Sequence, residues 1–114
     1  MGNTTSQIDI NWDKQDRHIR GTKEYDIAVQ SGKTPSVFMG REAAEKYVTD
    51  AWLTGDRDES RPGTTSERRM QTYKEVVGYD FNGNPLHQVK VVDSRTEKHG
   101  YPCGDGKPGQ RSLV

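Results

Sequence analysis

The clearest hydrophobic pattern in the chain lies in residues 41–53. Apolar side chains recur there at spacings of one, three and four residues, which gathers them on one face of a helix and leaves charged side chains on the other. Gly55 is expected to end this helix. A shorter helix is predicted over residues 23–30, with Thr22 as its N-terminal cap and Gly32 as its stop. Helices are therefore expected in the first half of the chain.

The second half of the chain shows the alternation that is typical of strands. Residues 72–79 and 86–92 flank Asn82-Gly83, which is a strong signal for a β-hairpin turn. We expect these two strands to pair antiparallel. Shorter extended segments are predicted at residues 8–12 and 36–39. Helices followed by an antiparallel sheet indicate an α+β fold.

A chain of 114 residues has room for one domain with a modest core. We expect residues 12–103 to form this domain and residues 1–11 to be a frayed N-terminal segment. Residues 104–114 are rich in Gly and Pro and are expected to be a flexible tail. Residues 56–66 are charged and show no periodicity, which predicts a mobile loop.

Composition excludes several classes of protein. The net charge is zero, which argues against a general nucleic-acid coat protein. Residues 1–60 carry 8 basic and 11 acidic side chains and residues 61–114 carry 9 and 6, so the halves differ only modestly in charge. The single Cys103 excludes an internal disulfide and a cysteine-based zinc site. The three histidines lack metal-ligand spacing, so neither a metal nor a cofactor is predicted.

Two polar segments far apart in the sequence contain the candidate chemistry. Residues 94–102 follow a predicted strand and include His99, Lys98 and Tyr101. Residues 14–21 place His18 among basic side chains. We expect the fold to bring these two segments together at one active site.

Two imidazoles and a few cations suffice to cleave RNA without a metal. One imidazole takes the proton of the 2′-hydroxyl, the other protonates the leaving 5′-oxygen, and the cations stabilise the charge on the phosphate. We predict His18 and His99 as this pair, in either order, because imidazole titrates near neutral pH. The other predicted catalytic residues are Lys14, Ser94 and Tyr101, and the predicted substrate-binding residues are Arg20, Lys98 and Arg95.

Other interpretations of these residues remain open. A histidine in a polar loop is commonly a plain surface residue, and His87 fits a cross-strand packing role better than catalysis. Ser94, Arg95 and Glu67 are also compatible with a cleft that degrades nicotinamide dinucleotides. A third hypothesis is a binding module whose acidic and basic halves dock a partner protein.

At both segments the chain resembles the RNase domains called polymorphic toxin type 50. The opening, Lys14-Gln15-Asp16-Arg17-His18-Ile19-Arg20-Gly21-Thr22-Lys23-Glu24-Tyr25, is similar to the family pattern Lys-Gln-x-x-His-Ile-x-Gly-Thr-x-x-Tyr. The ending, Ser94 followed by His99-Gly100-Tyr101-Pro102, is similar to the family's Ser and His-x-x-Pro. The resemblance spans about residues 12–102.

This resemblance implies a fold, an activity and partners. The fold would have N-terminal helices packed on a small antiparallel β-sheet, as in barnase, EndoU, colicin and RelE ribonucleases. The activity would be that of a metal-independent endoribonuclease toxin, acting as a monomer on transfer RNA or other RNA and blocked by an immunity protein. The domain would be secreted or delivered at the cell surface within a larger protein and would act in the cytoplasm of a target bacterium, without binding membranes.

Overall fold

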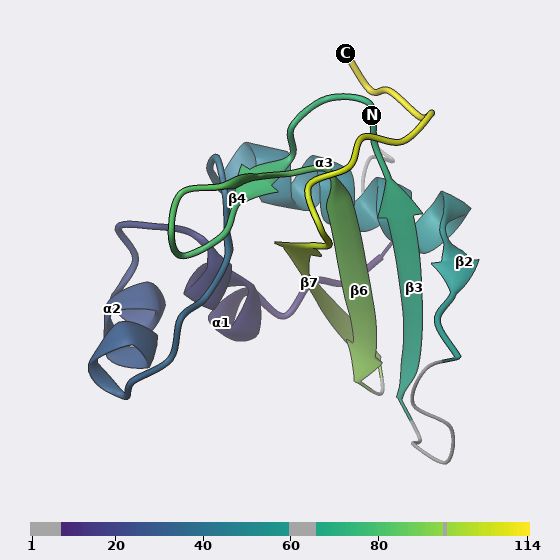
Figure 1. The fold of residues 1–114 in the computed structure, drawn as a ribbon. Coiled ribbons are helices and arrows are strands. Elements are labelled where there is room, and N and C mark those ends of the chain that lie inside the picture. The colour runs from purple at the N-terminus through teal and green to yellow at the C-terminus, as the bar shows by residue number, and fades with distance from the viewer. Residues whose placement is uncertain (1–7, 60–65, 95) are drawn as a thin grey trace.

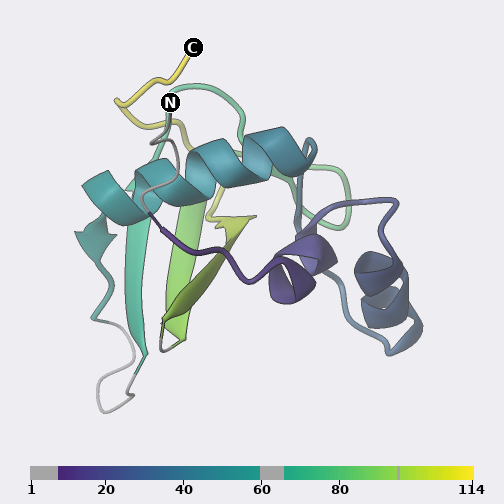
Figure 2. The ribbon, with the colours of Figure 1, turned by 180° about the vertical axis from the view of Figure 1, so that it is seen from behind.

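One long helix lies across one face of a four-stranded antiparallel sheet (Figures 1 and 2). A computed structural model describes residues 8–59, 66–94 and 96–114 of the chain. The helix is α3, Arg41–Thr54, which confirms the predicted amphipathic helix and its end at Gly55. The sheet has the order β2-β3-β6-β7, with the bounds Asp56–Arg57, Glu67–Thr72, Gln88–Ser94 and Glu97–Cys103.

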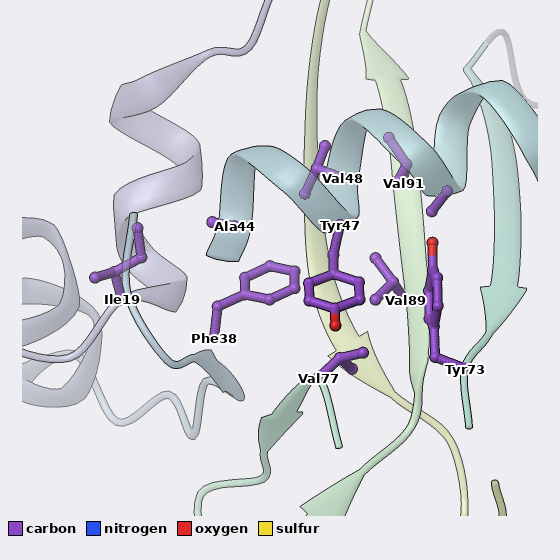
Figure 3. Packing of buried hydrophobic residues seen from close by; sticks show 10 residues of the cluster. Ile19, Phe38, Ala44, Tyr47, Val48, Tyr73, Val77, Val89 and Val91 are labelled. Carbon is purple, nitrogen blue, oxygen red and sulfur yellow. The ribbon is translucent and has the colours of Figure 1, made fainter. Parts of the chain in front are cut away.

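The core forms between α3 and the sheet (Figure 3). Val89 and Val91 of β6 are fully buried against Val48 and Ala51 of α3, because alternate side chains of a strand point to the same face. Each buried valine contributes roughly 1.5–3 kcal/mol of hydrophobic stabilisation. Gly100 of β7 lets the helix approach closely, since a Cβ atom there would lie 2.8 Å from Val48 Cγ2. The predicted α+β fold with an antiparallel sheet is confirmed.

Shorter elements lie beside this core. Thr22 caps α2 as predicted, its Oγ1 accepting a hydrogen bond from the Tyr25 amide at 3.0 Å. The Asn82-Gly83 turn is also confirmed, with Gly83 at a φ of 88° between β4 and β5. These shorter elements are α1 (Trp12–Gln15), the 3₁₀ helix η1 (Asp16–His18), α2 (Lys23–Gln30) and a second sheet of β1 (Val37–Phe38), β4 (Gly78–Tyr79) and β5 (Pro85–Leu86).

The predicted strand over residues 72–79 is wrong. β3 begins at Glu67 and pairs with β6, whereas the turn joins β4 and β5. The ladder of β3 with β6 ends at Thr72, and the backbone of Tyr73 then pairs with the C-terminal segment, its carbonyl accepting the Gly109 amide at 2.9 Å. The Tyr73 side chain is fully buried and donates its hydroxyl to Asp50 at 2.8 Å. The polar segment 94–102 also proves to be largely strand β7.

The ends and the charged loop differ from expectation where the structure describes them. Within the segment expected to be frayed, the Asn11 amide bonds to the Lys98 carbonyl at 2.9 Å, and residues 1–7 lie outside the described part. Within the expected loop, residues 56–57 form β2, while residues 60–65 lie outside the described part.

The expected flexible tail is instead attached to the domain. Arg111 donates to both carboxylate oxygens of Asp50, each at 2.6 Å, and Leu113 packs on the core cluster. Gly109 also donates its amide to the Tyr73 carbonyl at 2.9 Å. Glycine and proline made these residues appear unstructured, whereas a few specific long-range bonds hold them in place.

Candidate active site

Figure 1 looks onto the side of the sheet opposite α3. The strand register places mostly polar side chains on this side. No helix of the described residues crosses this side in Figures 1 and 2. We call it the open face. Strand alternation and register arrange its side chains in cross-strand rows. The rows are Ser94 with Glu97; Arg68, Val92 and His99; Met70, Lys90 and Tyr101; and Thr72, Gln88 and Cys103.

Gln15 joins the two segments that the sequence singled out. Its side chain is fully buried, and its amide bonds to both backbone groups of Gly100. Nε2 donates to the Gly100 carbonyl and the Gly100 amide donates to Oε1, each at 2.8 Å. This amide clamp fixes the end of α1 against the middle of β7. Segments 85 residues apart in sequence are thereby brought side by side.

The clamp places His18 beside Tyr101. The two rings are stacked, with centroids 5.3 Å apart and planes 25° apart. His18 Nδ1 lies 2.9 Å from the Ser36 carbonyl oxygen. Because a carbonyl can only accept, Nδ1 carries a proton and Nε2 is left for proton transfer. Burial lowers the pKa of His18, the Ser36 carbonyl opposes this effect, and Arg17 adds to it.

His99 occupies the open face one row from Tyr101 on the same strand. Burial, together with the positive charges of His18, Lys14 and Arg17, lowers its pKa to about 4. His99 is therefore neutral at neutral pH. Its Nδ1 is buried and finds no hydrogen-bond partner among the described residues. Because His18 stacks on Tyr101 and His99 lies two positions away on the same strand, the two imidazoles lie on the same face of the sheet.

The neighbouring rows add polar side chains that the sequence interpretation missed. Lys90 lies directly opposite Tyr101, and its Nζ is 3.0 Å from Asp58 Oδ2. Arg68 lies in the row of His99. Arg68 was noted in the sequence only as a basic residue beside the charged loop, and Lys90 was not singled out, because their approach to the site depends on the pairing of β3, β6 and β7. Gln15 entered only as part of the resemblance, and Ser36 was not a predicted site residue. Their roles depend on contacts with Gly100 and His18.

Not all predicted residues gather here. Ser94 shares the open face, diagonal to His99 and roughly 7–8 Å from it by strand geometry. Lys98 was expected beside His99 but points to the opposite face, because adjacent strand residues alternate. Its Nζ lies 3.3 Å from Asp93 Oδ1 and 4.8 Å from the centre of the Trp52 ring. Lys98 therefore does not belong to the site on the open face.

Arg20 also falls outside this site. Arg20 lines a separate cavity of about 430 Å³ with Phe38, Met39 and Tyr79. Arg20 was expected to join the histidines, but it lies at this separate cavity instead. Arg95 lies outside the described residues.

The residues suggested for dinucleotide degradation do not converge. Glu67 Oε2 lies 2.7 Å from Arg69 Nε, and its Oε1 lies 3.3 Å from Arg57. Its place in the register, opposite Asp93, puts it on the helix-facing side of the sheet, whereas Ser94 is on the open face. Glu67 and Ser94 therefore do not share one cleft.

The described residues show neither a metal cluster nor a membrane-spanning helix. They contain no group of three or more His, Cys, Asp or Glu side chains that could hold a metal ion. In the same part of the chain, no helix combines the length and apolar character needed to span a bilayer.

Comparison with known proteins adds no relative. The chain matches no family model, and no curated protein and no solved structure is similar to it. The function of the chain is therefore inferred from the geometry of this site and from the residue patterns in the sequence.

Proposed function

We propose that this chain is an endoribonuclease that cleaves RNA through the 2′-hydroxyl without a metal. The observation that carries the proposal is the Gln15–Gly100 clamp, which holds His18 and His99 together at the open face of an antiparallel sheet. An exposed sheet face bearing two imidazoles and cations offers an extended surface to a single RNA strand. The arrangement is in keeping with the barnase-like and RelE-like architecture that the resemblance implies.

The reaction needs one proton acceptor and one proton donor. The base removes the 2′-hydroxyl proton, and the 2′-oxygen forms a bond to phosphorus as the bond from phosphorus to the 5′-oxygen breaks. The acid delivers a proton to that leaving oxygen. The products are a 2′,3′-cyclic phosphate and a 5′-hydroxyl. Lys14 and Arg17 supply positive charge near the phosphate as its negative charge increases.

We assign the base to His99 and the acid to His18. His99 remains neutral because its pKa is lowered to about 4 by burial and nearby positive charge. His18 holds its Nδ1 proton against the Ser36 carbonyl, a bond that favours the protonated ring. A bound phosphodiester raises the pKa of both rings, because its negative charge favours imidazolium. Tyr101 orients the His18 ring by stacking on it.

The biological role follows from the resemblance at residues 14–25 and 94–102. The proposed role is a toxin domain that cuts transfer RNA or other RNA in a competing bacterium. It is delivered within a larger secreted or surface protein, acts as a monomer in the target cytoplasm and is neutralised by an immunity protein of the producing cell.

The test is incubation of the purified chain with total bacterial RNA in excess EDTA, followed by mapping of the new ends. The wild-type chain is expected to leave discrete 2′,3′-cyclic phosphate ends. His99→Ala is expected to reduce the rate about 10²–10⁴-fold, because it removes the proposed base. His87→Ala is the matched control, since His87 lies outside the open-face rows and should leave cleavage intact. Uncut RNA, or equal cutting by His99→Ala, would refute the proposal.

A further inference from the structure

A second polar site lies on the open face, at the far end from the Ser94 row. It is a cavity of about 390 Å³. Three neighbouring strands contribute its floor, because Thr72, Gln88 and Cys103 form one cross-strand row. Residues 104–108 form its wall. Figure 1 shows the chain leaving the end of β7 beside the start of β6 and the end of β3. We call this site the amide pocket.

The side-chain amide of Gln88 is held in place within the pocket. Its Nε2 donates to Thr72 Oγ1 at 3.2 Å, and its Oε1 lies 3.3 Å from the Cys103 sulfur. Burial raises the pKa of the Cys103 thiol to about 11, so this thiol remains a protonated donor. An amide has two N–H groups and an oxygen with two lone pairs. With one bond at each end, one N–H and one lone pair of this amide remain without a partner among the described residues.

The wall is shaped by glycines at positions that other residues adopt poorly. Gly104 and Gly106 have φ values of 96° and 88°. A Cβ atom at Gly104 would lie 3.1 Å from Gln88 Oε1. The loop thus passes directly over the Gln88 amide, and a side chain at Gly104 would push against it.

The pocket and the histidines lie on one continuous face. Val92 pairs with His99 and lies four positions after Gln88 on β6, which corresponds to roughly 13 Å of strand. The intervening row contains Tyr101 and Lys90, whose Nζ is paired with Asp58 at 3.0 Å. A single RNA strand laid across the histidines therefore reaches the amide pocket after a short run of nucleotides.

We propose that the amide pocket binds the base of an unpaired nucleotide in the RNA strand. This inference rests on the proposed function, because it extends the same substrate along the same face. A glutamine amide can make a paired donor and acceptor contact with a base edge, and unpaired RNA bases are recognised through such edges. Gln88 reads the base, while Thr72 and Cys103 keep its amide in orientation.

The test measures binding, so it does not depend on cleavage. The full chain is titrated with AMP, GMP, CMP and UMP and, separately, with ribose 5-phosphate, while its amide resonances are followed by NMR. At least one nucleotide is expected to give saturable shifts at Gly104, Gly106 and the Gln88 side chain. Gln88→Leu is expected to weaken this binding about tenfold or more, since it removes both hydrogen bonds.

Two further variants keep the test decisive. Gln30→Leu makes the same change at the exposed end of α2, away from the pocket, and should leave the affinity unchanged. Thr72→Val retains the shape but removes the acceptor of the Gln88 amide, so it should also weaken binding if Gln88→Leu does not fold. Equal binding of ribose 5-phosphate, unchanged affinity in the folded variants, or no saturable shift would overturn the pocket.

Cleavage then separates the two proposals. RNA cutting that depends on His99, without base-dependent binding at Gly104, would leave the ribonuclease standing and refute the pocket. Base-dependent binding that is lost in Gln88→Leu, without RNA cutting, would support a nucleotide pocket and refute the ribonuclease.

Discussion

At the scale of single residues, the two site histidines have different surroundings. His18 keeps one nitrogen on a backbone carbonyl, whereas the buried Nδ1 of His99 has no partner among the described residues. Burial lowers the pKa of both rings, but only His18 has a bond that favours its charged form. Environment rather than residue type thus separates a base from an acid.

The pH dependence of cleavage tests this assignment. Activity needs His99 in its neutral form, and His99 becomes protonated below a pH of about 4. Activity also needs His18 in its protonated form, and His18 loses its proton above its own pKa, which burial lowers from 6.5. For the free protein, kcat/KM should therefore be highest between a pH of about 4 and the pKa of His18, which lies below 6.5. The kcat profile should lie at higher pH, because a bound phosphate raises both pKa values.

Initial rates on a defined RNA, with circular dichroism to show that the chain stays folded across the range, provide the measurement. A kcat/KM that keeps rising above neutral pH would contradict the role of His18 as the acid.

At the scale of elements, α1 is attached to β7 by side-chain rather than sheet hydrogen bonds. α1 spans only Trp12–Gln15, too short to be stable by itself. Gln15 satisfies the amide and the carbonyl of Gly100, while the parallel bridge between Ile10 and Lys98 supports the preceding residues. The Gln15 amide is thus a main link between the His18 segment and β7, beside the bond from Ser36 Oγ to the Pro102 carbonyl at 2.7 Å.

Replacing Gln15 with Leu should reduce both stability and cleavage. Leu leaves two buried backbone groups of Gly100 unsatisfied, at a cost of about 2–4 kcal/mol in the free energy of unfolding. Urea denaturation measures this change. Gln30→Leu, at the exposed end of α2, is the control and should change the stability by less than about 0.5 kcal/mol. An equal free energy of unfolding in the two variants would show that the clamp does not stabilise the fold.

At the scale of the whole molecule, the C-terminal segment ties the long helix to the end of β3. Arg111 reaches Asp50 of α3, and the backbone of the same residue forms a bridge with Tyr73. Burial alone would raise the pKa of Asp50, but Arg111 and Tyr73 lower it below its usual value. The Leu113 amide donates to Glu75 at 2.9 Å. The tail is thus part of the folded unit.

Arg111→Leu should lower the urea midpoint, because Asp50 loses its bidentate partner while remaining mostly buried. Lys107→Leu removes another tail cation, whose 3.9 Å pair with Asp105 is exposed, and should leave the midpoint nearly unchanged. Denaturation curves of the two variants at neutral pH make the comparison. An unchanged midpoint in Arg111→Leu would mean that the tail adds no stability.

Local sequence patterns were enough to predict three features of the fold. The face of α3, the Thr22 cap and the Asn82-Gly83 turn each depend on residues near one another in the chain. The same reasoning failed for residues 72–79 and for the tail. Their conformations depend on Tyr73 and Arg111, which both reach Asp50 on a distant helix.

For the candidate site, the sequence by itself determined which side chains were available. These are Lys14 and His18 in residues 14–21, and His99 and Tyr101 in residues 94–102. Tertiary structure alone decided which of them meet. The register of β7 turns His99 and Tyr101 to the open face and Lys98 away from it, and Gln15 brings His18 alongside. The physical reason is that spacing along the chain encodes local periodicity, whereas contacts between distant segments depend on strand pairing and buried hydrogen bonds.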